Sequence, residues 1–357
     1  MKKMRKLLAL GLALTMALAL CACGARGGSS ASTSTAEGSG EETAAADGQT
    51  WEFIIADTDS EEHSTNVAAK EFADFMAEKT DGRFQVRVSA NGELGDDEEL
   101  LKAVQLGTIG MYVGYNGIVS GLMGDTLTMF ELPFLFEDGD HMLRTFNNGG
   151  LDLYNSQLEG TGYYNVAVGY EGARQIISTK KCITSLADIK GMKIRCGNVQ
   201  TFLDYYNSVG SAPTTVQFGE VYTSLSQGVI DAVDHVITVM GDQKYQEVAK
   251  YLTIDYHIIS PICYVVNENF WNTLPDDIKD VFVEGVNQMV ERQTEIDKGN
   301  EVNYPDEWAA ENGVEVFVMP QETRDEFKAA SQSVYDAYEQ KHPDLYEAAM
   351  QLVEDNR

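Results

Sequence analysis

The chain has 357 residues, of which 43% are hydrophobic and 23% are charged, a composition typical of a globular protein of about two domains. Its 56 acidic residues outnumber the 26 Lys and Arg residues and give a formal net charge of −30 at pH 7. This balance argues against nucleic acid as a partner, because phosphate binding needs clustered cations. An anionic ligand would bind against the overall field, so a few arginines would have to make the local potential positive.

The first residues have the pattern of an export signal. Four basic residues precede an apolar run over 7–20, which is shorter than the ~20 residues of a membrane span. The pair Ala22-Cys23 resembles the lipobox of bacterial lipoproteins, so we expect a signal peptide over 1–22 and a lipid on Cys23; a signal peptide without lipidation is the alternative. Residues 23–49 contain no aromatic or large apolar side chain and are predicted to be a flexible tether.

The body of the chain opens with alternating strands and helices. Hydrophobic periodicity predicts a buried strand, an amphipathic helix, an alternating strand, a second helix and a third strand. This order indicates an α/β domain with a largely parallel sheet. The five elements cover 51–56, 64–80, 84–88, 96–106 and 110–114.

A second alternating region begins near residue 163 and is followed by a helical C-terminal part. Predicted strands cover 166–169, 174–178, 192–195 and 229–233. Predicted helices cover 186–190, 201–209, 219–228, 277–301 and 324–354, the last interrupted by Pro343. Two α/β regions without a linker between them indicate two lobes joined by several crossings of the chain, with the ligand in the cleft between the lobes.

Motifs for catalysis, cofactors and metals are absent from the sequence. It has no phosphate loop, no dinucleotide-binding turn, no HExxH and no GxSxG, and its five histidines are scattered. The cysteines of the body, Cys182, Cys196 and Cys263, are odd in number and form no CxxC, so we expect buried free thiols rather than a zinc site, with one disulfide as the alternative. We therefore expect no metal, no cofactor and no enzymatic activity.

Several short segments, taken together, resemble the DctP-type solute-binding proteins of TRAP transporters. The resemblance rests on the order and spacing of the pieces and covers about residues 50–345. The matching segments are Glu93-Leu-Gly-Asp-Asp97, Leu132-Pro-Phe134-Leu, Gly172-Ala-Arg174, Leu186 to Asn198, Val209-Gly-Ser-Ala-Pro-Thr214, Phe218-Gly-Glu-Val-Tyr222, Leu225 to Asp231 and Tyr245 to Thr253.

The resemblance implies a site built around an arginine. It assigns Arg195 as the residue that binds the substrate carboxylate, which suits the planar, permanently charged guanidinium. Arg174 corresponds to a second family arginine that contacts or orients the ligand. Asn198 corresponds to an amide that hydrogen-bonds the ligand, with a turn residue as the alternative. Phe218 corresponds to an aromatic that packs on the ligand, with core packing as the alternative.

Further candidates lie where relatives place contacts from the first lobe. These are His63, for which helix capping is the alternative, Asp97, Tyr115 and Asn116. The family pattern DGQEN is replaced here by residues 231–235, so His235 stands in place of an amide. A histidine can donate to a hydroxyl or a carboxylate, and we expect it to be able to gain charge near pH 6.5.

The resemblance implies a two-lobed α/β fold like that of periplasmic binding proteins, with a cleft between the lobes and long C-terminal helices crossing both. The expected lobes are 50–171 plus 261–300 and 172–260 plus 301–357. The expected role is an extracytoplasmic receptor, held to the membrane by a lipid, that delivers a small organic acid to the small and large membrane subunits of a transporter. A uronate or aldonate is the preferred ligand, followed by a C4-dicarboxylate or keto acid. An anchored extracellular enzyme and a ligand-sensing adaptor are the alternatives.

Overall fold

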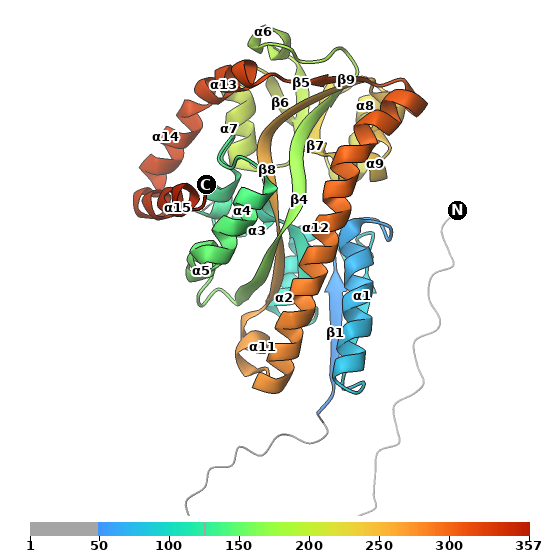
Figure 1. The fold of residues 1–357 in the computed structure, drawn as a ribbon, viewed down its shortest axis with the longest axis vertical. Helices are drawn as coiled ribbons and strands as arrows, with labels where there is room; N and C mark the ends of the chain where they lie inside the picture. The colour runs from blue at the N-terminus through green and yellow to red at the C-terminus, as the bar shows by residue number, and fades with distance from the viewer. Residues whose placement is uncertain (1–48, 125) are drawn as a thin grey trace, which may run out of the picture. The chain divides into compact units, whose positions relative to one another are not determined.

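The computed structural model describes residues 49–124 and 126–357. The predicted signal peptide, most of the predicted tether and Cys23 lie outside the described residues. The strands of the described part form one mixed sheet with the order β2-β1-β3-β8-β4-β7-β5-β6, and β9 pairs with β8 (Figure 1). They are β1 (Trp51–Ala56), β2 (Phe84–Ser89), β3 (Met111–Tyr115), β4 (Tyr163–Ser178), β5 (Lys193–Cys196), β6 (Ala212–Thr215), β7 (Ala232–Val236), β8 (Tyr251–Asn267) and β9 (Glu315–Val318).

Helices cover both faces of this sheet (Figure 1). The α-helices are α1 (Ser64–Lys79), α2 (Asp97–Gln105), α3 (Asn116–Leu122), α4 (Gly139–Thr145), α5 (Leu151–Ser156), α6 (Leu186–Ile189), α7 (Gln200–Ser208), α8 (Val221–Ser226), α9 (Ile237–Asp242), α10 (Tyr245–Val248), α11 (Glu268–Thr273), α12 (Asp276–Asn312), α13 (Gln321–Ala330), α14 (Gln332–Lys341) and α15 (Pro343–Asp355). Three short helical segments are η1 (Thr126–Glu131), η2 (Phe146–Gly150) and η3 (Phe218–Glu220).

The first half of the chain follows the sequence prediction closely. The strands and helices β1, α1, β2, α2 and β3 form in the predicted order, each within a few residues of its predicted bounds. α2 starts where the sequence carries a capping box: Asp96 accepts from the backbone N–H of Glu99, and the Glu99 carboxylate accepts from the backbone N–H of Asp96. Local capping chemistry and hydrophobic spacing are sufficient to define these elements.

The three strands of the first predicted region pair in parallel, as predicted, but the complete sheet is mixed because the two longest strands run antiparallel to each other. β8 has 17 residues, was not predicted, and pairs antiparallel with both β3 and β4. The predicted strands 166–169 and 174–178 are parts of β4, which continues through an irregularity in pairing at Tyr170 and Gly172. Gly172 has a φ of +138°, and a Cβ there would lie 3.1 Å from Val236. This close approach explains why glycine interrupts the apolar pattern inside a continuous strand.

Three further regions differ from the prediction. The strand predicted over 229–233 starts later, at Ala232, because Gly228 turns the chain with a φ of +70° and leaves Val229 54% exposed. The helix predicted over 277–301 continues through Pro305 to Asn312 and ends at Gly313, which has a φ of +65°. The helical region predicted over 324–354 is divided into α13, α14 and α15.

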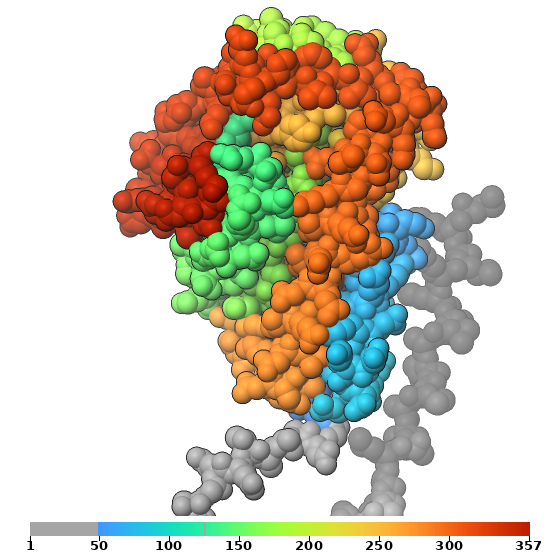
Figure 2. Space-filling model, viewed as in Figure 1, coloured from blue at the N-terminus to red at the C-terminus, as the bar shows by residue number. Residues whose placement is uncertain are grey.

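The long strands β4 and β8 connect the two parts of the sheet. One end of β8 pairs with β3, and its other end pairs with β9. The predicted lobe boundaries at 171/172 and 260/261 fall inside this strand pair, where Gly172 is opposite Ser260. α12 packs against α1, β4 and α9 and so follows the same path as the two strands, as its long orange surface beside α1 shows (Figure 2). The division into two lobes remains a prediction.

Three apolar clusters fill the described part of the chain. A large one joins α2 and β3 to α7 and α14. A second packs Phe53, Phe72 and Phe282 between β1, α1 and α12, and a third packs Leu225, Ile230 and Trp308 between α8, β7 and α12. The cysteines 182, 196 and 263 are buried and free, as predicted. Over the described ranges, we find no helix with the length and apolar character needed to cross a bilayer.

Candidate functional site

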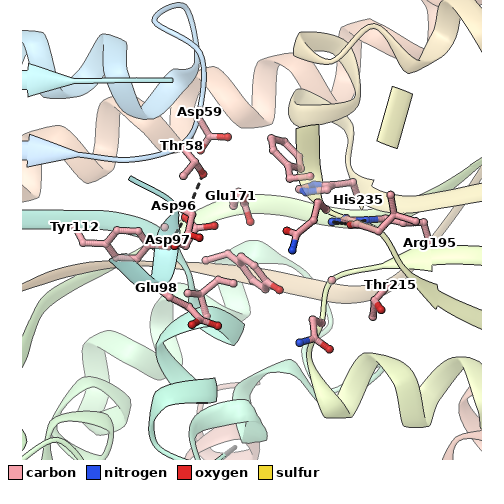
Figure 3. Close-up of a pocket in the computed structure, with 18 of the residues that line it drawn as sticks. Thr58, Asp59, Asp96, Asp97, Glu98, Tyr112, Glu171, Arg195, Thr215 and His235 are labelled. Atoms are coloured by element: carbon pink, nitrogen blue, oxygen red, sulfur yellow. Dashed lines mark hydrogen bonds between the residues drawn. The ribbon is translucent and has the colours of Figure 1, made fainter. Parts of the chain in front are cut away.

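A cavity of about 510 Å³ opens where β1, β3, β5 and β7 end and β4 crosses between them. The carboxyl ends of strands are a common place for ligands in α/β sheets, because the loops there face a common crevice. Figure 3 shows side chains that reach this space from opposite sides, with Arg195 and His235 on one side and Asp59, Asp97 and Tyr112 on the other. The lining residues are Thr58, Asp59, Asp96, Asp97, Glu98, Tyr112, Val113, Gly114, Tyr115, Ile118, Glu171, Arg174, Arg195, Gly197, Asn198, Thr215, Val216, Gln217, Phe218 and His235.

Arg195 lies in β5, a strand flanked in parallel by β6 and β7. Its side chain is 7% exposed and lines the cavity. Nε and Nη2 each donate to the carbonyl oxygen of Val216 at 3.2 Å, which holds the guanidinium in place without neutralising it. Burial lowers its pKa, but an arginine stays protonated at any working pH. The cavity therefore contains a positioned cation that can meet an anion.

Arg174 also lines the cavity, but its charge is already matched. Its Nε donates to Asp234 Oδ1 at 2.9 Å and its Nη2 donates to the Asp234 carbonyl at 3.0 Å. Burial alone would lower its pKa, yet the Asp234 carboxylate raises that pKa above the ordinary value. His257 lies between Asp234 and Asp255, at 3.3 Å and 2.8 Å, and these carboxylates raise its pKa to about 9 despite burial. The four side chains form a buried network with paired charges.

Two aromatic rings lie near the guanidinium of Arg174. Its guanidinium carbon lies 4.6 Å from the ring centre of Phe202 and 5.9 Å from that of Tyr115. The Tyr115 and Phe202 rings stack at 6.2 Å, and the Tyr115 hydroxyl is buried with no hydrogen-bond partner among the described residues. A Cβ at residue 197 would lie 2.4 Å from that hydroxyl, so Gly197 provides the space that Tyr115 occupies.

His235 faces the same cavity from β7 and packs against Phe218, with ring centres 5.9 Å apart. Burial, together with the nearby Arg174 and Arg195 charges, holds its pKa well below the ordinary value. The expectation that His235 gains charge near pH 6.5 is therefore wrong. Its Nδ1 accepts from the backbone N–H of Val236 at 3.0 Å, so the neutral ring carries its proton on Nε2 and offers a donor there.

The opposite side of the cavity is acidic. Asp97 Oδ1 accepts from Thr58 Oγ1 at 3.1 Å and from the Tyr112 hydroxyl at 3.0 Å. Glu171 is 5% exposed, and its Oε2 accepts from Ser260 Oγ at 2.8 Å. Burial raises the pKa of both carboxyls. Burial and the neighbouring Asp97 raise the pKa of Asp59 to about 7.

Seven of the nine predicted binding residues line this one cavity: Asp97, Tyr115, Arg174, Arg195, Asn198, Phe218 and His235. Asn198 is exposed, and no hydrogen bond of its side chain occurs within the described ranges. His63 and Asn116 are not among the lining residues. His63 caps α1 by accepting from the backbone N–H of Thr65, and Asn116 donates to the Leu127 carbonyl at 3.0 Å. Their predicted ligand contacts remain predictions.

Sequence reasoning missed Asp59, Tyr112 and Glu171. Glu171 precedes Gly172 directly, and a carboxylate next to a buried strand segment is a signal that was available. Asp59 lies in the polar loop after β1 and differs in no local way from other acidic loop residues. The described residues hold no group of three or more His, Cys, Asp or Glu side chains placed to bind a metal ion.

Comparison with known proteins shows which protein family this chain is similar to. The model of the family described as "Bacterial extracellular solute-binding protein, family 7" matches residues 55–341. The chain is 30% identical over 224 residues to the 2,3-diketo-L-gulonate-binding periplasmic protein YiaO of Escherichia coli K12, covering 63% of this chain and 68% of the relative. It is 28% identical over 211 residues to the C4-dicarboxylate-binding periplasmic protein DctP of Rhodobacter capsulatus, covering 59% and 63%.

A solved structure has a similar fold. It is a TRAP periplasmic solute-binding protein from Roseobacter denitrificans with bound β-D-glucuronate. It superposes with a TM-score of 0.79 at 26% identity, over 85% of this chain and 98% of that chain.

Proposed function

Because the chain belongs to family 7 of the bacterial extracellular solute-binding proteins, the DctP family of TRAP transporters, we propose that it is a receptor that captures a sugar acid for transport. The family consists of extracytoplasmic binding proteins that act without catalysis and take small organic acids as ligands. The observation that carries the proposal is the Arg195 guanidinium, which is buried beside a cavity of about 510 Å³ and, among the described residues, donates only to the Val216 carbonyl. A carboxylate entering the cavity would replace its lost hydration by bidentate hydrogen bonds to this group.

The preference for a sugar acid is supported by the polar groups around Arg195 and by two relatives. The cavity volume lies within the range of about 300–1,000 Å³ typical of small-molecule sites. Hydroxyl groups of a uronate or aldonate would find acceptors in Asp97 and Glu171 and a donor in His235. One relative is named for binding 2,3-diketo-L-gulonate, and a solved structure at 26% identity holds glucuronate. A C4-dicarboxylate, for which another relative is named, is the competing ligand.

We assign the residue roles as follows. Arg195 binds the carboxylate, while Asn198 and His235 hydrogen-bond the groups next to it and Phe218 packs on the ligand. Arg174 positions the site through Tyr115 and Asp234 instead of binding the anion, since its charge is matched. Asp97 and Tyr115 contact the ligand from the other side of the cavity. His63 and Asn116 support the loops beside them.

We further propose that the receptor closes on its ligand, docks on the transporter and is anchored at the membrane. The lobes 50–171 plus 261–300 and 172–260 plus 301–357 would close on the ligand and exclude water. The closed form would then dock on the small and large membrane subunits of the transporter. Cys23 would carry the lipid that holds the chain at the outer surface of the cell membrane.

A ligand panel tests the proposal. The purified chain is heated with glucuronate, galactonate, succinate, malate or pyruvate, and the unfolding midpoint is followed. Binding stabilises the folded chain by RT ln(1 + [L]/Kd), which is about 2.7 kcal/mol at one hundred times Kd. We expect the largest shift with a sugar acid. The absence of a shift with every organic acid would exclude the receptor function.

A further inference from the structure

Arg174, Arg195 and His235 form one end of the cavity, its basic end, which can neutralise one negative charge of a ligand. Two lining residues are arginines, and only Arg195 among the described lining residues is a cation without a carboxylate partner. The charge of Arg174 is matched by Asp234 at 2.9 Å. His235 is neutral, because burial holds its pKa well below the ordinary value. A ligand with one carboxylate therefore satisfies this end completely.

Asp59, Asp97 and Glu171 line the other end of the cavity, its acidic end. The described lining residues of this end include no cation that could bind a second carboxylate of the ligand. The partners of Asp97 are the hydroxyls of Thr58 and Tyr112, and the partner of Glu171 is the hydroxyl of Ser260. No hydrogen bond of the described residues reaches Glu171 Oε1, although the side chain is 95% buried and lines the cavity.

The remaining charged neighbours do not change this balance. Asp59 lies 3.9 Å from His63, but burial lowers the pKa of His63, which leaves that ring neutral at pH 7. The first turn of α2 is a poor place for an anion. The backbone amides of Asp96 and Glu99 are bonded within the capping box, and the side chains Asp97, Glu98 and Glu99 are themselves acidic. The acidic side thus presents carboxyl oxygens, and the described lining residues there include no cation.

We infer that Asp97 and Glu171 are specificity-determining residues that accept hydroxyl donors from the far end of the ligand and reject a second carboxylate there. The inference rests on the proposed function and narrows it to monocarboxylates, which removes C4-dicarboxylates and aldarates from the ligands of this site. The physical reason is that a second carboxylate would lose its hydration there and meet carboxyl oxygens, with no cation among the described lining residues at that end to replace the lost water. A hydroxyl at the same position would instead supply the donor that these carboxylates lack.

Pairs of acids that share one carbon skeleton test the inference. Galactonate and galactarate differ only in the oxidation of the terminal carbon, and erythronate and meso-tartrate differ in the same way. Calorimetric titration of the purified chain is expected to give a Kd at least about 100-fold lower for the monoacid of the better-binding pair. A diacid that binds as tightly as its monoacid would overturn the inference.

Two isosteric variants locate the effect. Asp97→Asn keeps an oxygen acceptor for Thr58 and Tyr112, and Glu171→Gln keeps one for Ser260, while each directs an amide N–H₂ to the cavity. In each variant, the Kd of the diacid divided by the Kd of the monoacid is expected to be at least about tenfold lower than in the wild type. Asp74→Asn, at an exposed site on α1, removes the same formal charge far from the cavity and should leave the ratio unchanged within about twofold.

The outcomes separate the inference from the function on which it rests. Equal binding of monoacid and diacid, or ratios in Asp97→Asn and Glu171→Gln that match that of Asp74→Asn, would refute the specificity role while the receptor function stands. No binding of any acid, mono or di, would refute both. The wild-type comparison needs no variant, so it decides the matter even if one of the amide variants fails to fold.

Discussion

The two ends of the cavity differ in the partners of their ionisable side chains. At the basic end, Arg174 is paired with Asp234 and lies near two aromatic rings, so its charge contributes to the fold. Arg195 is bonded to a carbonyl and keeps an unmatched charge. At the acidic end, the side chains of Asp97 and Glu171 accept hydrogen bonds from hydroxyl groups of described residues. The comparison shows that the partner of a buried charge, rather than the residue type, decides whether it stabilises the fold or remains available to a ligand.

The largest effect is expected where a charge is part of the scaffold. Asp234→Asn would leave the buried Arg174 guanidinium without a counterion and should lower the free energy of unfolding by about 3–5 kcal/mol. Urea unfolding of the ligand-free chain measures it. The double variant Arg174→Met/Asp234→Asn removes both charges and should be more stable than Asp234→Asn alone. An unchanged unfolding midpoint for Asp234→Asn would show that the ion pair of Arg174 with Asp234 does not stabilise the fold.

The next effect concerns Arg195, whose charge remains available to a ligand. Arg195→Ala should weaken sugar-acid binding by about 2–5 kcal/mol, or roughly 30- to 5,000-fold in Kd, because a buried charge pair loses one partner. Arg195→Lys should fall between the wild type and Arg195→Ala, since an ammonium cannot bind a carboxylate through a planar fork. Calorimetry gives the affinities, and cooperative unfolding of the ligand-free variants is the control. Wild-type affinity in Arg195→Ala would place the carboxylate elsewhere.

A third effect arises from the acidic end and is spread over several pH units. The pKa of Asp59 is raised to about 7, so the folded chain holds a proton there that the unfolded chain releases near pH 4. Its contribution to stability is complete below pH 4 and is lost as the pH rises through about 7, at about 1.4 kcal/mol per pH unit. Glu131, whose pKa burial raises to about 8, acts in the same direction.

Urea unfolding between pH 5 and pH 8 tests this dependence. The wild-type free energy of unfolding should fall across the range, and Asp59→Asn should reduce the slope between pH 5 and pH 7. Asp74→Asn serves as the control, because its carboxylate is exposed. Equal slopes for the wild type and Asp59→Asn would show that this carboxyl titrates normally.

Much of the site was predictable because its residues lie in short segments with a recognisable pattern. Arg195, Asn198, Phe218 and His235 come from one stretch of the chain, and local signals gave the strands and loops that carry them. The charge state of these residues was not predictable. The pKa of His235 depends on burial and on Arg174, which lies on a different strand.

The sequence by itself determined the family resemblance, most of the elements of the first half and seven residues of the cavity, because hydrophobic spacing, capping and motifs act over a few neighbouring residues. The tertiary structure decided the antiparallel return of β8, the pairing of Arg174 with Asp234 and the gathering of Asp59, Asp97 and Glu171 on one side. These depend on groups far apart in the chain. The environment of a charge is set by whatever folding brings within a few ångströms of it, and no local pattern encodes that.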